Sequence, residues 1–334
     1  MNEKLQNNYL YNQIVELLNS ARQRVIQNVN KTMVDTYFEI GKVIVEKEQQ
    51  GDKKAEYGKN LITGLSKRLT TEFGKGFSTT NIKQMRSFYL AYQKGQTLSD
   101  EFVLSWSHYL KLMRIDDENE RKFYEVETTK NRWSVRELNR QFDTGLYTRL
   151  LLSKGKRGIK GLSKKGLILE KPSDLIKDPY ILEFIGLPNN SKYSESELEQ
   201  RIINKLEYFL LELGTGFTFV GRQIRITSGI DHFYIDLVFY NRLLQCFVLI
   251  DLKIGKIKHQ DIGQMQMYVN YYDREVKTKF EKPTIGLILC KEKNDFVIEY
   301  TLPKNNEQIF TSKYQTVLPS KIALKKLLDL QKEE

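Results

Sequence analysis

Residues 229–253, GIDHFYIDLVFYNRLLQCFVLIDLK, decide the fold of the second half of the chain. Apolar residues dominate two runs separated by a short turn, which predicts a β-hairpin with strands over residues 232–240 and 245–253. Asp236 interrupts the first strand, and Asp251 interrupts the second. Charged side chains seldom lie in a core strand without a partner or a function, so these two acids mark a candidate site.

The turn determines which residues of the two strands face each other. If it is centred on Leu243 and Leu244, apolar residues pair with apolar residues and Asp236 lies beside Asp251, about 5 Å away. Lys253 then points to the same face as Asp251. Two carboxylates this close repel each other unless a cation lies between them, and such oxygen ligands suit Mg²⁺. A metal site with a nearby lysine fits phosphodiester hydrolysis, and a structural ion pair is the alternative.

Helix and strand patterns alternate through the rest of the second half. Apolar spacing predicts helices over residues 195–213 and 259–273, and strands over residues 219–227, 284–290 and 296–302. Together with the hairpin, the elements up to residue 290 give the order α-β-β-β-α-β, which indicates a mixed sheet flanked by helices. We expect an α+β protein overall, with an α/β second half.

Helical spacing dominates the first half, which shows no convincing strand and is expected to be all-α. Residues 8–50 predict one long helix or a helix pair. A glycine turn at residues 74–76 precedes another helix with polar side chains off its apolar face. This helix fits either the second helix of a helix-turn-helix motif or an ordinary solvated helix of a bundle. Its candidate DNA contacts are Asn81, Lys83, Gln84 and Arg86.

Lysine and arginine outnumber acidic residues by 53 to 42, and the formal charge of +11 favours binding to polyanions such as DNA. The surplus lies entirely before residue 172. Glycines and basic residues without an apolar period indicate a connector over residues 153–171. We therefore predict a helical DNA-binding domain over residues 1–152, a basic linker over 153–171 and the α/β domain over 172–334. The linker residues expected to contact phosphates are Lys154, Lys156, Arg157 and Lys160.

The chain is expected to be cytoplasmic, without a membrane partner. No apolar run approaches the length of a membrane span, and the start MNEKLQNNYL lacks the layout of a signal peptide. Cys246 and Cys290 lie in apolar runs and are expected to be buried thiols. No motif suggests a nucleotide cofactor.

Asp251 follows Asp236 after fifteen positions and opens the triplet Asp251-Leu252-Lys253. This spacing resembles the signature of the PD-(D/E)XK nucleases, a superfamily that uses the α-β-β-β-α-β order. Longer segments, among them LLELGTGFTFVGRQIRI, FYIDLVFYNRLLQCFVLIDLK and IGQMQMYVNYYD, resemble the bacterial nuclease-domain proteins of the YhcG type. EYGKNLITGLSKRLTTEFGKGFS and WSVRELNRQF extend the resemblance to the helical half, so that it covers nearly the whole chain.

Two positions depart from the family pattern. Ile235 stands where the signature has proline, and Asp251 stands where these proteins more often have glutamate. A shorter acid at this position can alter the geometry of a bound metal without abolishing its binding.

The resemblance implies a restriction-endonuclease-like domain that binds Mg²⁺, for which Mn²⁺ can substitute. It assigns metal coordination to Asp236, Asp251 and the backbone carbonyl of Leu252. It assigns catalysis to Lys253, and orientation of water or phosphate to Gln264.

Two further groups of residues belong to this expectation. Tyr268 lies four residues after Gln264 on the same helix face and is a candidate accessory residue. The superfamily often adds an acid from the first helix of the domain, for which Glu199 is the first choice, followed by Glu197 and Glu195. A solvated helix face is the alternative for each.

Three functions are weighed on these grounds. The first is a Mg²⁺-dependent endonuclease acting on double-stranded DNA, with DNA binding supplied by the helical half. The second is a weakly active or inactive DNA-binding or assembly subunit on a nuclease fold. The third is a structure-specific nuclease similar to junction resolvases or transposases. Formation of a homo-oligomer stays open.

Overall fold

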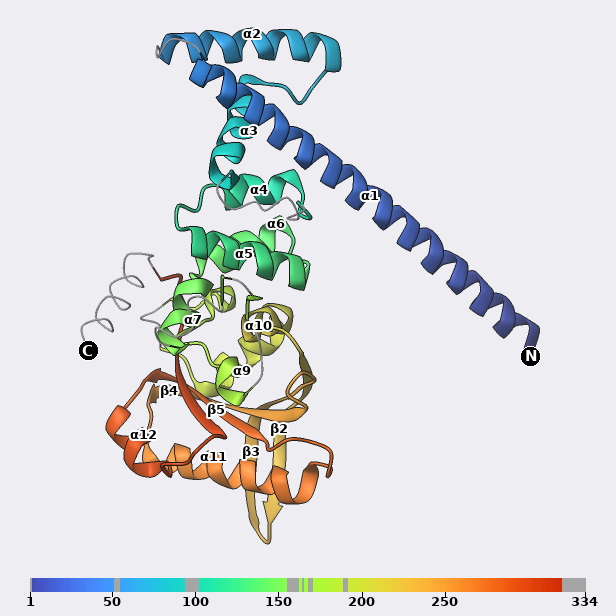
Figure 1. The fold of residues 1–334 in the computed structure, drawn as a ribbon. Helices are drawn as coiled ribbons and strands as arrows, with labels where there is room; N and C mark the ends of the chain where they lie inside the picture. Colours follow the sequence, from blue (N-terminus) through green and yellow to red (C-terminus); the bar gives the residue numbers. More distant parts are fainter. Residues whose placement is uncertain are drawn as a thin grey trace. The chain divides into compact units, whose positions relative to one another are not determined.

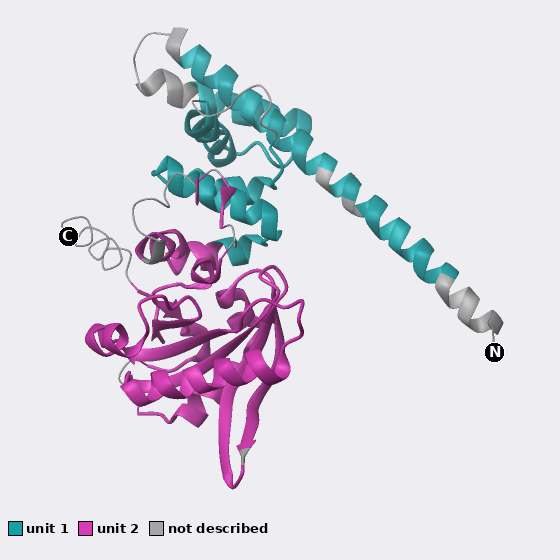
Figure 2. Cartoon of the chain, turned by 60° about the horizontal axis from the view of Figure 1, so that its bottom comes forward, with its two compact units in different colours: residues 1–138 teal, residues 139–334 magenta. Residues whose placement is uncertain are grey.

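A computed structural model describes residues 2–50, 55–93, 102–154, 162–163, 165–167, 171–188 and 192–319 of the chain. It contains two compact units, residues 1–138 and residues 139–334 (Figure 2). The predicted domain boundaries, at residues 152 and 172, stay a prediction, because much of the predicted linker lies outside the described residues. None of the described helices is long and apolar enough to cross a membrane.

Unit 1 is helical, as the sequence predicts, and its described residues contain no strand (Figure 1). The first predicted helix is a single long helix rather than a pair. Ser78 caps the helix after the glycine turn, because its hydroxyl accepts a hydrogen bond from the N–H of Asn81 at 3.2 Å. The helices are α1 (Asn2–Gln50), α2 (Ala55–Phe73), α3 (Thr79–Tyr92), α4 (Trp106–Leu112), α5 (Glu118–Asn131) and α6 (Val135–Asp143), which continues into unit 2.

The core of unit 1 forms where the second half of α1 packs against α3. Val34, Ile82 and Met85 are fully buried there. Phe88 is also buried and packs against the aromatic ring of Phe102. Gly41 allows the two helices to approach closely, because a Cβ at this position would lie 2.2 Å from the backbone oxygen of Met85. The contact between α1 and α3 is therefore set by a backbone approach as well as by side chains.

Unit 2 is a mixed six-stranded sheet with the strand order β1-β6-β5-β4-β3-β2. β2, β3 and β4 are antiparallel neighbours, whereas β4, β5, β6 and β1 are parallel. The strands are β1 (Tyr180–Ile181), β2 (Phe217–Ser228), β3 (Asp231–Asn241), β4 (Cys246–Lys256), β5 (Ile285–Glu292) and β6 (Ile309–Gln315). The helices are α7 (Leu146–Lys154), α9 (Glu195–Asn204), α10 (Leu206–Leu213), α11 (His259–Tyr271) and α12 (Asp295–Thr301), with 3-10 turns at Pro172–Leu175 and Glu183–Ile185 and a π-helical turn at Tyr272–Val276.

Helices cover both faces of this sheet and create two apolar layers. The layer under α9 and α10 contains the buried residues Leu198, Phe209, Leu237, Phe239, Cys246, Val248, Ile250 and Leu252. The layer under α11 contains Ile235, Val238, Leu249, Met265, Tyr268 and Ile288. Both cysteines are buried and free, as predicted. The arrangement confirms the predicted α+β class.

Regular alternation places Phe233, Ile235, Leu237 and Phe239 on one face of β3; the alternation holds for β4, whereas in β3 both Phe233 and Ile235 lie in the other layer. Cys246, Val248, Ile250 and Leu252 share a face as expected, whereas Ile235 packs under α11 instead of beside Leu237. The described pairing between β3 and β4 ends at Leu237, and from there only β2 accompanies β3. Strand twist is unconstrained by a second neighbour in this part, so Ile235 turns to the other layer.

The prediction of a strand over residues 296–302 is wrong, because this segment forms α12. The Asn294 side chain accepts a hydrogen bond from the N–H of Val297 and caps the helix, and Val297, Ile298 and Leu302 pack at helical spacing against the layer under α11. The strand that completes the sheet comes later, at β6, which the sequence analysis missed. The predicted helix over 195–213 is interrupted at Lys205, where the backbone leaves helical geometry.

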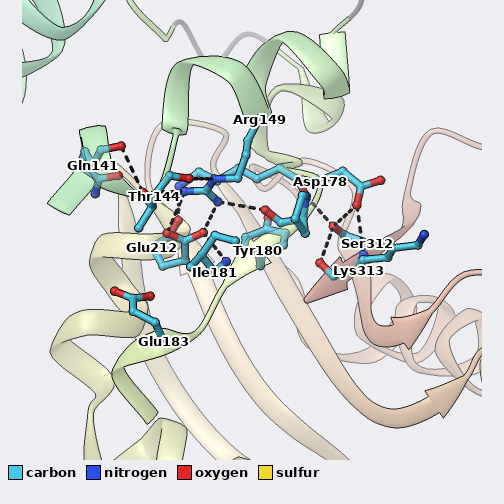
Figure 3. Close-up of polar contacts among 12 residues, drawn as sticks. Gln141, Thr144, Arg149, Asp178, Tyr180, Ile181, Glu183, Glu212, Ser312 and Lys313 are labelled. Atoms are coloured by element: carbon cyan, nitrogen blue, oxygen red, sulfur yellow. Dashed lines mark hydrogen bonds and ion pairs between the residues drawn. The ribbon is translucent and has the colours of Figure 1, made fainter. Parts of the chain in front are cut away.

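A buried ionic network ties α7 to the sheet domain (Figure 3). Arg149 and Glu212 are both fully buried, and Arg149 Nη1 lies 2.5 Å from Glu212 Oε1. Arg149 also donates to the carbonyl oxygens of Thr144 and Pro179, and the N–H of Ile181 donates to Glu212. Burial alone would raise the pKa of Glu212, but the cations of Arg149 and of a neighbouring lysine lower it overall. The pair is therefore ionised and fully hydrogen-bonded.

Candidate active site

The predicted hairpin register is confirmed, and it places two acids at the point where β3 separates from β4. Leu237 pairs with Ile250, so that Asp236 and Asp251 are the next residues in register. The described pairing ends here, and Asp236 Oδ2 accepts a hydrogen bond from the backbone N–H of Leu252 at 2.8 Å. The carboxylate of Asp236 therefore takes the place of a backbone partner where the inner strands β3 and β4 separate.

Asp251 is a buried carboxylate with one cationic neighbour. Its side chain is 4% exposed, and Lys253 Nζ lies 2.8 Å from its Oδ2 atom. The two groups therefore form an ion pair inside the sheet domain. Burial, together with the charge of Asp236, raises the pKa of Asp251 to about 7 despite the nearby ammonium group. A further cation beside Asp251 would therefore stabilise the ionised form of its carboxyl group.

Lys253 connects Asp251 to the first helix of the domain. Its Nζ atom lies 3.8 Å from Glu195 Oε2, besides its contact with Asp251. Burial would lower the pKa of Lys253, but these two carboxylates raise it overall. Lys253 therefore stays protonated and supplies a positive charge beside Asp251.

Gln223 links Glu199 to Asp236. Its amide Nε2 lies 2.5 Å from Glu199 Oε2 and 3.1 Å from Asp236 Oδ1, and it donates to both. Gln223 has a left-handed backbone with φ of 48°, which is unusual for a residue other than glycine and costs conformational energy. Burial raises the pKa of Glu199, with a further contribution from the charge of Asp236 that the Gln223 hydrogen bond opposes. These contacts bring Glu199 to the site.

The other two acids of α9 lie in different places. Glu195 contacts Lys253, and its Oε1 also accepts a hydrogen bond from the N–H of Ile254 at 3.3 Å. Glu197 forms an exposed ion pair with Arg201, 3.0 Å away, on its own helix. Of the three candidates, Glu199 and Glu195 reach the strand edge, and Glu197 does not.

Gln264 and Tyr268 form a chain of hydrogen bonds on α11. Gln264 Nε2 donates to the Tyr268 hydroxyl at 2.5 Å, and this hydroxyl donates to the backbone oxygen of Tyr234 at 2.8 Å. Burial raises the pKa of Tyr268, and the charge of Asp251 adds to this effect. Tyr268 therefore holds Gln264 against the strand that carries Asp236.

The donor set fits a divalent cation in its chemistry. Asp236, Asp251 and Glu199 offer carboxylate oxygens, the ligands that Mg²⁺ prefers. The buried Oδ2 of Asp251 lies beside the Lys253 ammonium group, its cationic neighbour among the described residues. Among the described residues, no three acidic, histidine or cysteine side chains already converge on one point.

The predicted DNA contacts on α3 have different surroundings. Asn81 donates to the carbonyl of Gly76 and accepts from Trp106 Nε1 at 2.9 Å, so its side chain is engaged in the fold. Arg86 lies 2.6 Å from Glu48 of α1 in an ion pair. Lys83 is exposed, and Gln84 is half-buried. Lys83 is therefore the most available of the four.

The predicted linker contacts cannot be placed in the same way. Lys156, Arg157 and Lys160 lie outside the described residues. Lys154 is the last residue of α7. Their proposed role in phosphate binding stays a prediction.

Sequence analysis missed Gln223 and ranked Glu195 last among its acids. Gln223 lies in a strand whose pairing shifts register between Phe219 and Gly221, which a regular period-two pattern does not reveal. Gln223 directly faces Asp236 in the neighbouring strand, so a count along the hairpin turn at Gly229 would have identified it.

Two protein families match the chain. The DUF1016 N-terminal domain matches residues 13–149, and the YhcG PDDEXK nuclease domain matches residues 173–329. A protein of Escherichia coli (strain K12) named "Putative nuclease YhcG" is 38% identical over 340 residues, which cover 93% of this chain and 90% of that protein.

Solved structures show a more distant likeness. A repair endonuclease from Pyrococcus abyssi aligns with 40% of this chain and 50% of its own, at 13% identity and a TM-score of 0.26. A complex of EndoMS with double-stranded DNA aligns with 40% of this chain and 51% of its own, at 12% identity and a TM-score of 0.26.

The mixed sheet, with its acids and lysine at the edge of β3 and β4, and the family match over residues 173–329 define a PDDEXK nuclease domain that follows a helical domain. The identity to the Escherichia coli protein extends over both parts. The chain belongs to the YhcG family of nuclease-domain proteins.

Proposed function

We propose that this protein is a Mg²⁺-dependent endonuclease that hydrolyses phosphodiester bonds of double-stranded DNA. The observation that carries the proposal is the buried Asp251, which lies next in register to Asp236 and in ionic contact with Lys253. A buried acid with a raised pKa beside a second acid and a lysine is typical of a catalytic site rather than of a structural pair.

Asp236, Asp251, Glu199 and the backbone carbonyl of Leu252 would hold the metal, and Mn²⁺ would substitute for Mg²⁺. When bound, the ion supplies Lewis-acid stabilisation of the negative charge that develops on the scissile phosphate. The Gln223 amide would keep Glu199 and Asp236 close to each other before the ion arrives.

Lys253 and Gln264 would act on the reacting atoms. Water adds to phosphorus and loses a proton to solvent, the bond from phosphorus to one deoxyribose oxygen breaks, and that oxygen takes up a proton from solvent. The Lys253 ammonium group, held between Asp251 and Glu195, would stabilise the negative charge of the phosphate oxygens. The Gln264 side chain, fixed by Tyr268, would orient the attacking water or the phosphate.

Exposed basic residues border this strand edge, although the domain as a whole is neutral. Arg225 lies on β2, Lys256 ends β4, and Lys258 precedes α11. Their charges would bind DNA phosphates near the site. The helical half, with the exposed Lys83 and the basic linker, would supply further contacts to the duplex.

Plasmid cleavage tests the proposal. Purified protein is incubated with supercoiled plasmid and Mg²⁺ or Mn²⁺, beside an Asp251→Asn variant that keeps the size of the side chain but removes its charge. Asp295→Asn, at an exposed position of α12, is the matched control. Cleavage by the wild type and the control, with loss in Asp251→Asn, is expected. Equal cleavage by all three proteins would refute the assignment.

The same assay, extended to branched and linear DNA, separates two other candidates. An assembly or DNA-binding subunit without activity is favoured by the ionic contact between Lys253 and Asp251, which already neutralises one acid. It predicts binding without cleavage in any divalent metal. A structure-specific nuclease predicts cleavage of branched DNA and little cleavage of linear duplex.

A further inference from the structure

The two halves of α1 differ in their surroundings. Val34, Ile44 and Val45, in the second half, are buried against other helices of unit 1. The first half runs beyond those helices (Figure 1) and has no buried side chain among the residues from 10 to 33 whose side chains are described. Nine large apolar residues in it are between 39% and 66% exposed: Leu10, Tyr11, Ile14, Leu17, Leu18, Val25, Ile26, Val29 and Met33.

These residues form one continuous face, which we call the α1 stripe. At 3.6 residues per turn, its centre lies along Tyr11, Ile14, Leu18, Val25 and Val29, which fall within about 60° of arc. The other four stripe residues widen this face on both sides. A helix with an apolar face of this width normally packs against another helix.

The charge of the stripe excludes DNA as its partner. Arg22 is the only charged residue that projects within the face; Arg24 lies at its edge beside Leu17, and Glu16 lies on the opposite side of the helix. A surface that binds phosphates needs several cations, so one arginine among nine apolar side chains does not suit a nucleic acid.

The area of the stripe suits a protein interface of ordinary size. It extends over about 35 Å of helix. Each side chain of this kind presents roughly 60–120 Å² of apolar surface, so nine of them present on the order of 500–1,100 Å². A standard interface buries about 800 Å² on each partner. One partner helix of similar length is enough to cover the stripe.

We propose that the α1 stripe binds the same stripe of a second copy of this chain, with the two helices antiparallel. The stripe is complementary to itself in this orientation. If the two-fold axis crosses the stripe at the level of residue 20, Tyr11 of one copy faces Val29 of the other and Ile14 faces Ile26, so that apolar residues meet along the interface. Arg22 then faces Leu18 of the other copy, whereas a parallel pair would place two arginines side by side. Opposed helix dipoles add to the preference.

The resulting dimer is isologous and closed, because each copy contributes the same surface. It leaves the second half of α1 free to keep its packing within unit 1. The inference does not depend on nuclease activity, so it can fail or hold independently of the proposed function.

Light scattering after size exclusion tests the dimer with the full chain. The wild type is expected to be a dimer at micromolar concentrations. Leu18→Glu places a charge in the centre of the stripe and is expected to yield monomers. Ser20→Glu adds the same charge on the opposite side of the helix and is the matched control that stays dimeric. Leu18→Ala, which preserves helix propensity, is expected to weaken the dimer by at least tenfold in Kd.

Folding of the variants is checked by their helical circular dichroism, so that loss of the dimer is distinguished from loss of structure. A wild-type monomer would overturn the proposal, and so would a dimer that Leu18→Glu and Ser20→Glu affect equally.

Cysteine cross-linking tests the orientation. Cys246 and Cys290 are buried, so a thiol introduced on the stripe reacts selectively. A mixture of Tyr11→Cys and Val29→Cys proteins is expected to form the mixed disulfide dimer, because the antiparallel pair brings these positions together. Efficient dimers of Tyr11→Cys with itself, without the mixed species, would overturn the antiparallel arrangement.

Discussion

Asp236 Oδ2 accepts a hydrogen bond from the backbone N–H of Leu252, at 2.8 Å, in the position where a strand partner would otherwise stand. One oxygen of this carboxylate is therefore fixed by β4, and the other is shared with Gln223. The same contact fixes the Asp251–Leu252 peptide, directly before the Leu252 carbonyl that is a proposed metal ligand. The end of the pairing between β3 and β4 and the proposed metal site therefore involve the same residues.

Asp236→Asn should remove most of the activity while preserving the fold. The amide can still accept the hydrogen bond from Leu252, but it lacks the negative charge that attracts a divalent ion. We expect cleavage of plasmid DNA to fall by about 10²–10³-fold. Calorimetric titration with Mg²⁺ should show weaker binding. Unchanged binding of Mg²⁺ would exclude Asp236 as a ligand.

Stabilisation by Mg²⁺ should increase with pH, because Asp251 must lose its proton before it binds the ion. Its pKa is raised to about 7 in the folded protein, above its ordinary value. In metal-free protein this group makes the free energy of unfolding decrease as the pH rises to about 7. Added Mg²⁺ should therefore raise Tm more at pH 8 than at pH 6. Asp251→Asn should show the same small increase at both pH values.

Gln223→Gly and Gln223→Ala should differ in stability, although both remove the amide. The backbone at this position has φ of 48°, which glycine adopts without strain and alanine does not. We expect the glycine variant to be more stable by about 1 kcal/mol in urea denaturation. Equal stability would show that the neighbouring strands relieve the strain.

Arg149→Met should destabilise unit 2 strongly, because it leaves the buried Glu212 without its main cation. Loss of one partner of a buried ion pair costs about 3–5 kcal/mol. The double variant Arg149→Met/Glu212→Gln should recover part of this loss, since the buried Glu212 carboxylate is removed together with its main cation. Thermal unfolding of the three proteins measures the difference. A double variant less stable than Arg149→Met would contradict the explanation.

Arg225→Ala combined with Lys256→Ala should weaken DNA binding without changing metal binding. Both side chains are exposed beside the proposed site. The slope of log K against log salt concentration should decrease by about 2, one unit for each lost phosphate contact. Binding measured in Ca²⁺ at several salt concentrations tests this. Lys279→Ala with Lys304→Ala provides a control of equal charge outside the site.

The sequence was sufficient for the central part of the nuclease domain. Alternation and turn position together determined the register of β3 and β4, because a shift by one residue would have moved apolar side chains into solvent. The order of the first three strands and α11 was predictable because strands alternate with a period of two residues and helices with a period of 3.6 residues. These features depend on local patterns, which one sequence contains in full.

The remaining features depend on contacts between distant segments. The residues of α12 have the composition of a strand, but the Asn294 side chain caps them as a helix. Gln223 reaches two acids only because its strand is irregular, and Ile235 changes layers where β3 loses a neighbour. Asn81 has the chemistry of a DNA contact, yet Trp106 engages its side chain. Such outcomes are set by tertiary packing and cannot be derived from residue spacing.

The Arg149–Glu212 pair also bears on how such a protein can change during evolution. By family match, residues up to 149 belong with the helical domain, whereas residues 139–149 are part of the compact unit that contains the sheet. A recombination event that exchanged the nuclease domain at residue 173 would bring in a buried glutamate or leave a buried arginine, with no guarantee of an opposite charge. Exchange of this domain between relatives is therefore expected to succeed only when the breakpoint lies before residue 139, so that α7 is inherited together with the sheet.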